Sequence, residues 1–114
     1  MERTLLYVAA IAGGLGVAAG AFGSHWLDLD PAAQNTYDIA SRYHLIHAVA
    51  LLICAAASDR VCRWSGWLFA FGIVLFSGSL YALAMGGPSW LGPVTPVGGL
   101  AFVAGWILLP FKRL

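Results

Sequence analysis

Three histidines are the residues whose types and spacing could carry chemistry in this sequence. His44 and His47 are three positions apart, so they share a face if the segment is helical, and His25 ends an apolar stretch upstream. Three imidazoles can coordinate zinc or copper, two can ligate a haem iron, and one can relay protons near neutral pH. The histidines can also serve structure alone, by hydrogen bonding to each other and to nearby groups. The His-x-x-His spacing leaves these alternatives open.

Hydroxyl groups accompany the histidines. Ser41 is three residues before His44, on the same helix face, and Ser77 and Tyr81 are four residues apart in a later apolar stretch, where they share a face. We therefore predict that a ligand or metal would bind near His25, His44 and His47. The polar neighbours of this candidate site are Ser41, Ser77, Ser79 and Tyr81. The sequence identifies no catalytic residue and no cofactor.

The elements that position these residues are predicted to be membrane-spanning helices. Hydrophobic residues make up 61% of the 114 residues and charged residues 10%, against roughly 25% charge in a soluble domain. A helical crossing needs about 20 mostly apolar residues. Stretches with few or no charges, the last two separated by a turn rich in glycine and proline at 86–93, predict a single transmembrane domain, an all-α four-helix bundle. Its spans are expected at about 4–24, 41–58, 64–85 and 95–111.

Two of these helices carry a recognisable start. Asp30 followed by Pro31 is typical of an N-cap and a first helical position. This predicts that the second helix begins at about 30–40, at the membrane interface, before its apolar part. Thr95 followed by Pro96 predicts a similar start for the last helix.

The positive charges are distributed unevenly between the two sides of a four-crossing chain. One side holds the N-terminus, the second connection and the C-terminus, with Arg3, Arg60, Arg63, Lys112 and Arg113. The other side holds only Arg42, together with Asp28, Asp30 and Asp38. The positive-inside rule then predicts a multi-pass protein of the cell (inner) membrane with both termini in the cytoplasm. Trp64, Trp67 and Trp106 are expected near the inner interface.

Small residues form a stripe on the first span and recur on the last. Small side chains let helix backbones approach closely in lipid, where the hydrophobic effect does not drive association. The stripe predicts either packing within the chain or a homodimer seam. The residues expected to serve this packing are Gly13, Gly16, Gly20, Gly23, Gly98 and Gly99.

Several function classes are disfavoured by the composition. A net charge of +1 without a cluster of basic residues argues against nucleic acid as a partner. The spans carry no carboxylate in their cores, which a proton-coupled exporter would be expected to have. There is no nucleophile elbow, phosphate-binding loop or dinucleotide fingerprint.

Four segments carry a resemblance to a known family: residues 20–27 (GAFGSHWL), 43–48 (YHLIHA), 76–81 (FSGSLY) and 92–99 (GPVTPVGG). Together they resemble the domain-of-unknown-function 423 family of small inner-membrane proteins, whose animal relatives are called transmembrane protein 256. The resemblance implies a four-helix membrane protein and brings no activity with it. It places His25, His44, His47 and Tyr81 on the family's motif positions. The sequence has Ser24-His25-Trp26 where the family more often has Ala-His-Gly.

The function expected from the sequence is therefore that of a small non-enzymatic membrane protein, either an accessory or scaffold subunit or a binder of a small ligand. The alternative is a metal- or haem-binding protein that uses the histidines near the outer face. The expected partners are the lipid bilayer and, as a further alternative, a second copy or a larger membrane complex.

Overall fold

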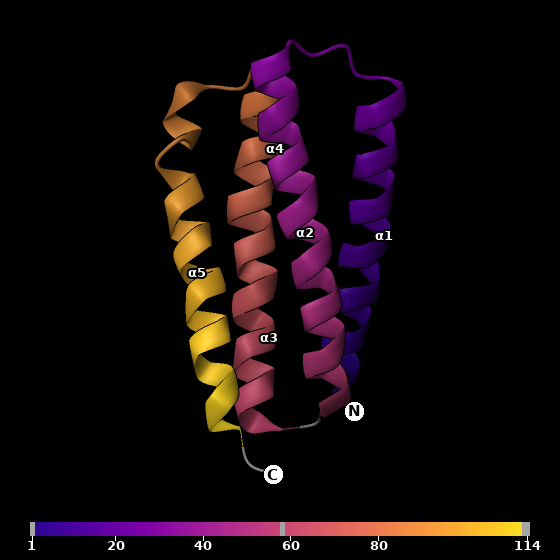
Figure 1. Ribbon diagram of the computed structural model, residues 1–114. Helices are drawn as coiled ribbons and strands as arrows, with labels where there is room; N and C mark the ends of the chain where they lie inside the picture. The colour runs from indigo at the N-terminus through magenta and orange to yellow at the C-terminus, as the bar shows by residue number, and fades with distance from the viewer. Residues whose placement is uncertain (1, 58, 113–114) are drawn as a thin grey trace.

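The computed structural model describes residues 2–57 and 59–112, and in this part of the chain every regular element is helical. Four rods long and apolar enough to cross a membrane lie side by side (Figure 1). The first rod is α1 (Arg3–His25), and the second is α2 (Pro31–Ala57). The third consists of α3 (Arg60–Gly72), η1 (Ile73–Ser77) and α4 (Gly78–Ala84). The last consists of η2 (Ser89–Leu91), α5 (Val94–Leu108) and η3 (Leu109–Phe111). The predicted all-α membrane class is confirmed. Ser58 and Arg113, which entered the predictions above, lie outside the described residues.

The first two rods begin at carboxylate caps. The Glu2 carboxylate accepts a hydrogen bond from the Thr4 amide at 3.3 Å, and Asp30 Oδ1 accepts from the Ala33 amide at 2.8 Å. Such caps satisfy amides of the first turn that have no carbonyl partner within the helix. From Pro31 onward α2 is unbroken for 27 residues, so its polar first turns and its apolar part form one helix.

The third rod begins at Arg60 rather than at 64, because Asp59 caps it by accepting from the amides of Val61 and Cys62 at 2.9 and 3.3 Å. Its middle is the π-helical turn η1, which places an extra residue in the hydrogen-bond ladder. This turn is where α5 comes closest, since a Cβ atom on Gly98 would stand 2.3 Å from the backbone nitrogen of Phe76. The two backbones therefore meet almost directly.

The last rod starts differently from the expectation. α5 begins at Val94 after Pro93, with no side-chain cap, so the prediction of Thr95 as its N-cap is wrong. The Thr95 hydroxyl instead forms a hydrogen bond with the Ser79 hydroxyl of α4, because an interhelical partner is within reach. The preceding turn depends on Gly86, whose φ of +88° lies in the left-handed region that glycine adopts readily.

Two glycine seams hold the rods together. In the seam between α1 and α2, a Cβ atom added at Gly16 would stand 2.6 Å from Leu45. One added at Gly20 would stand 3.3 Å from the Ser41 hydroxyl, and one added at Gly23 would stand 2.2 Å from the Tyr37 ring. In the seam between the third rod and α5, a Cβ atom added at Gly72 would stand 2.3 Å from Phe102, and one added at Gly105 would stand 2.5 Å from Phe69. Both seams lie within the chain, so these glycines serve intramolecular packing.

The outer surface is apolar over most of its length. Large aliphatic side chains such as Ile11, Leu15, Val74 and Leu100 are 60–69% exposed, which in water would be an unusually large apolar patch. The molecule measures 47 × 27 × 18 Å, and its long axis matches the roughly 40–45 Å of a bilayer with its headgroups. The exposed side chains are thus the lipid-facing surface.

Candidate functional site

His44 connects three helices through both of its ring nitrogens. Its Nε2 lies 2.8 Å from the carbonyl oxygen of Ala12 in α1, and its Nδ1 lies 2.9 Å from the hydroxyl of Tyr81 in α4. A carbonyl only accepts, so Nε2 carries the proton, and in the neutral ring Nδ1 accepts from the Tyr81 hydroxyl. His44 is 6% exposed. It is therefore an interhelical connector whose lone pair is already engaged.

His47, three residues further along α2, is directed to a different neighbouring helix and has the opposite tautomer. Its Nδ1 lies 2.8 Å from the Tyr43 carbonyl, to which it donates, and its Nε2 accepts from the indole N–H of Trp106 at 3.0 Å. The indole only donates, so Nε2 must be unprotonated and the ring neutral. The ring also stacks on Phe102, with centroids 3.7 Å apart and planes at 9°.

The three histidines do not form a shared site. His44 is directed to α1 and α4, His47 to α5, and His25 is exposed at the end of α1 beside Trp26. Metal coordination requires a free nitrogen lone pair, and those of His44 and His47 are occupied by Tyr81 and Trp106. No group of three potential metal ligands is found within the described residues. The geometry gives no support to the metal or haem hypothesis.

The predicted polar neighbours also bind within the bundle. Ser77 donates to the Ala40 carbonyl at 2.8 Å, and Ser79 contacts the Phe76 carbonyl at 3.0 Å as well as Thr95. Ser41 lies against Gly20 in the α1–α2 seam. Over residues 2–57 and 59–112, every buried side-chain nitrogen or oxygen has a hydrogen-bond partner. Of these neighbours, only Tyr81 is joined to a histidine by a hydrogen bond.

The glycines named from the sequence divide into two groups. Gly16, Gly20, Gly23 and Gly98 lie where another helix approaches, and Gly99 makes an ordinary contact with Phe76 at 3.5 Å. A Cβ atom on Gly13 would have nothing within 4 Å. Gly13 therefore does not serve close packing within this chain.

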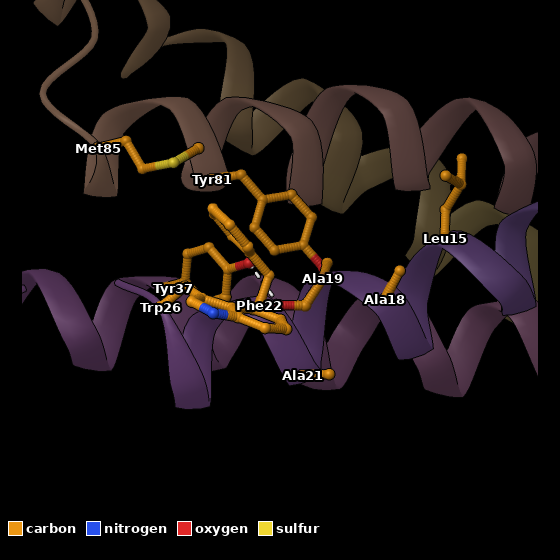
Figure 2. A pocket seen from close by; sticks show the side chains of 9 residues that line it. All are labelled: Leu15, Ala18, Ala19, Ala21, Phe22, Trp26, Tyr37, Tyr81 and Met85. Carbon is orange, nitrogen blue, oxygen red and sulfur yellow. Dashed lines mark hydrogen bonds between the residues drawn. The ribbon is translucent and has the colours of Figure 1, made fainter. Parts of the chain in front are cut away.

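One feature that can receive a molecule is a groove between α1 and α4, at the end of the bundle away from the start of α1 (Figure 2). Its volume is about 710 Å³. It is lined by Leu15, Ala18, Ala19, Ala21, Phe22, Trp26, Tyr37, Tyr81 and Met85. A second groove of about 240 Å³ continues along α1 past Leu15 and is bordered by His44. We call the two together the side groove.

Tyr37 and Tyr81 form the polar part of the side groove. Their rings contact edge to face with centroids 5.0 Å apart, and the Tyr37 hydroxyl donates to the Ala19 carbonyl. Tyr37 is buried, whereas Tyr81 is partly exposed to the groove. Figure 2 shows both rings directed toward α1. The Tyr81 hydroxyl proton is engaged by His44, so its oxygen presents a lone pair as an acceptor.

Sequence reasoning missed Trp106 as a contributor and placed Tyr37 only on the helix stripe of Ser41 and His44. Trp106 was assigned to an interfacial belt, yet its N–H is the partner of His47. Tyr37 closes the α1–α2 seam over Gly23. The signal for Tyr37 was present, because it lies one helical turn before Ser41 and two before His44. No sequence spacing could have found Trp106, which is 59 residues from His47.

The fold and the contacts define a multi-pass membrane protein whose polar side chains largely bind its own helices. The family model described as "Protein of unknown function (DUF423)" matches residues 19–99. The chain belongs to this family of small membrane proteins, as its sequence motifs predicted.

Relatives match the chain over almost its whole length. UPF0382 inner membrane protein YgdD of Escherichia coli (strain K12) is 42% identical over 114 residues, covering 95% of this chain and 87% of that protein. UPF0382 membrane protein YwdK of Bacillus subtilis (strain 168) is 37% identical, covering 94% and 93%. A UPF0382 membrane protein of Staphylococcus epidermidis is 37% identical, covering 98% and 96%. No solved structure matches the chain.

Proposed function

We propose that this chain is a non-enzymatic membrane protein that binds a lipid-soluble molecule in its side groove. The observation that carries the proposal is an apolar groove of about 710 Å³ between α1 and α4, in the part of the molecule that faces hydrocarbon. Ligand pockets are typically of about 300–1,000 Å³ and are mostly apolar, with a few polar groups that orient the ligand. Access is from the side, so the molecule would enter from the bilayer.

The chemistry of the groove favours an apolar chain with a hydroxyl head group. The Tyr81 oxygen can accept but not donate, because its proton is engaged by His44. The indole N–H of Trp26, at the end of the groove, can donate. A hydroxyl both donates and accepts, so it matches either group. The apolar chain would then lie along Phe22 and Leu15 toward the second groove.

We also propose that both termini are cytoplasmic and that the open part of the side groove lies in the outer half of the bilayer. The start of α1, the end of α2 and the start of α3 lie at one end of the bundle (Figure 1). That end carries Arg3, Arg60, Arg63 and Lys112 among the described residues, as the positive-inside rule requires of a cytoplasmic end.

The test is photo-crosslinking of the purified protein in vesicles with a long-chain alcohol that carries a photoreactive group in its chain. We expect labelling on α1 and α4. Ala18→Phe would fill the groove and abolish this labelling. Ala56→Phe, at an exposed position of α2 outside the groove, is the matched control and should leave it unchanged.

The head group is tested separately. Tyr81→Phe should weaken labelling by the alcohol roughly two- to tenfold, the equivalent of one hydrogen bond, and leave labelling by the matching hydrocarbon probe unchanged. Labelling that is the same in Ala18→Phe and Ala56→Phe would contradict the proposal.

A further inference from the structure

The start of α3 combines positive charge and exposed aromatic rings in one pocket. Arg60, Arg63, Trp64 and Trp67 line a cavity of about 400 Å³. The spacing places Arg60 above Trp64 and Arg63 above Trp67, each pair four residues apart on the helix surface. The indole rings are 63% and 42% exposed. Such rings are stable at the headgroup level of a bilayer, where one edge is apolar and the other is wet.

The nearby carboxylates offset only part of the positive charge of this pocket. Asp59 accepts from two backbone amides as the cap of α3. Glu2 caps α1 and also forms an ion pair with Arg63, with 3.2 Å between Glu2 Oε2 and Arg63 Nε. Among the described residues, Arg60 has no ion pair. Arg60 therefore supplies the unpaired positive charge of the pocket, and the guanidinium of Arg63, which also lines it, has further N–H donors.

We propose that this pocket binds the headgroup of an anionic phospholipid. Arg60 and Arg63 would contact its phosphate, and Trp64 and Trp67 would lie beside its glycerol region. A lipid is favoured over a soluble anion because the rings place the pocket at the membrane interface, where the lipid phosphate is held at the right depth. This pocket and the open part of the side groove lie at opposite ends of the molecule. Lipid binding at the pocket therefore does not depend on the proposed function.

The experiment is native mass spectrometry of the full chain released from mixed micelles of phosphatidylglycerol and phosphatidylcholine in equal amounts. We expect the protein to retain phosphatidylglycerol preferentially. Arg60→Gln should reduce this preference about fivefold, the effect of one basic residue at a membrane surface. Arg60→Lys should keep most of it, since the charge remains.

Arg42→Gln is the matched control, because it removes the same charge from an exposed position at the other end of the bundle. It should not change the preference. An equal loss in Arg42→Gln and Arg60→Gln, or no loss in Arg60→Gln, would overturn the proposal. Displacement of the lipid by inorganic phosphate at constant ionic strength would also overturn it, because the pocket would then recognise a soluble anion.

Discussion

At the scale of single residues, the two buried histidines are held as neutral rings in opposite tautomers. His44 carries its proton on Nε2 because a carbonyl faces that atom, and His47 carries it on Nδ1 for the same reason. The remaining nitrogens accept from Tyr81 and Trp106. Each ring therefore joins α2 to a different neighbour, and interhelical hydrogen bonds replace the missing hydrophobic driving force between helices in lipid.

His47→Ala is expected to destabilise the protein by about 2–4 kcal/mol, because it removes a stacked ring and leaves the Trp106 N–H without its acceptor. His25→Ala should change stability by less than about 0.5 kcal/mol, since His25 is exposed. Thermal unfolding of the purified variants in detergent measures the difference. His47→Phe, which preserves stacking on Phe102, should lie between the two. Equal unfolding midpoints for His47→Ala and His25→Ala would contradict this assignment.

The residue types of the site could be predicted from the sequence, but their partners could not. Helical spacing placed Ser41 and His44 on α2 and Ser77 and Tyr81 on the third rod, in compatible halves of the membrane. It could not give the rotation of each helix, so it could not show that His44 and His47 are directed to different neighbours. The partners are a backbone carbonyl of Ala12 and the distant indole of Trp106, and neither leaves a local signal.

At the scale of the elements, close backbone contact organises the bundle. The π-helical turn η1 and Gly98 meet where the third rod and α5 are closest. The four apolar stretches follow from hydropathy, because the requirement to span about 30 Å of hydrocarbon is strict. The π turn does not follow from it, since an insertion into the hydrogen-bond ladder changes the contacts of one turn without changing its composition.

Gly98→Ala is expected to destabilise the protein by about 1–3 kcal/mol, because the added methyl group would stand 2.3 Å from a backbone atom that cannot rotate away. Gly13→Ala is the matched control: nothing lies within 4 Å, and alanine favours a helix over glycine by about 0.5–1 kcal/mol. It should therefore leave the unfolding midpoint unchanged or raise it. Loss of stability in Gly13→Ala, with none in Gly98→Ala, would show that the α1 stripe and not the η1–α5 seam is the tighter contact.

At the scale of the whole molecule, the two ends of the bundle differ chemically. One end carries Arg3, Arg60, Arg63 and Lys112, while the other carries the acidic connection after α1 and the open part of the side groove. The two proposed sites lie at opposite ends. An anionic lipid at the basic end would reinforce the orientation that the positive charges favour. The side groove would then take its ligand from the other leaflet.

This asymmetry predicts the orientation of the chain in the cell membrane. In a background of Cys54→Ala and Cys62→Ala, which removes both buried thiols, single cysteines are introduced by Asp28→Cys or Lys112→Cys. A membrane-impermeant maleimide is added to spheroplasts, in which the outer face of the inner membrane is exposed to the medium. It should label Asp28→Cys directly and Lys112→Cys only after lysis. The physical reason is that translocating the four cations at the basic end costs more than translocating the acidic connection. The reverse labelling pattern would invert the proposed orientation. Labelling of both positions in intact cells would be incompatible with the three crossings that separate them, made by α2, the third rod and the last rod.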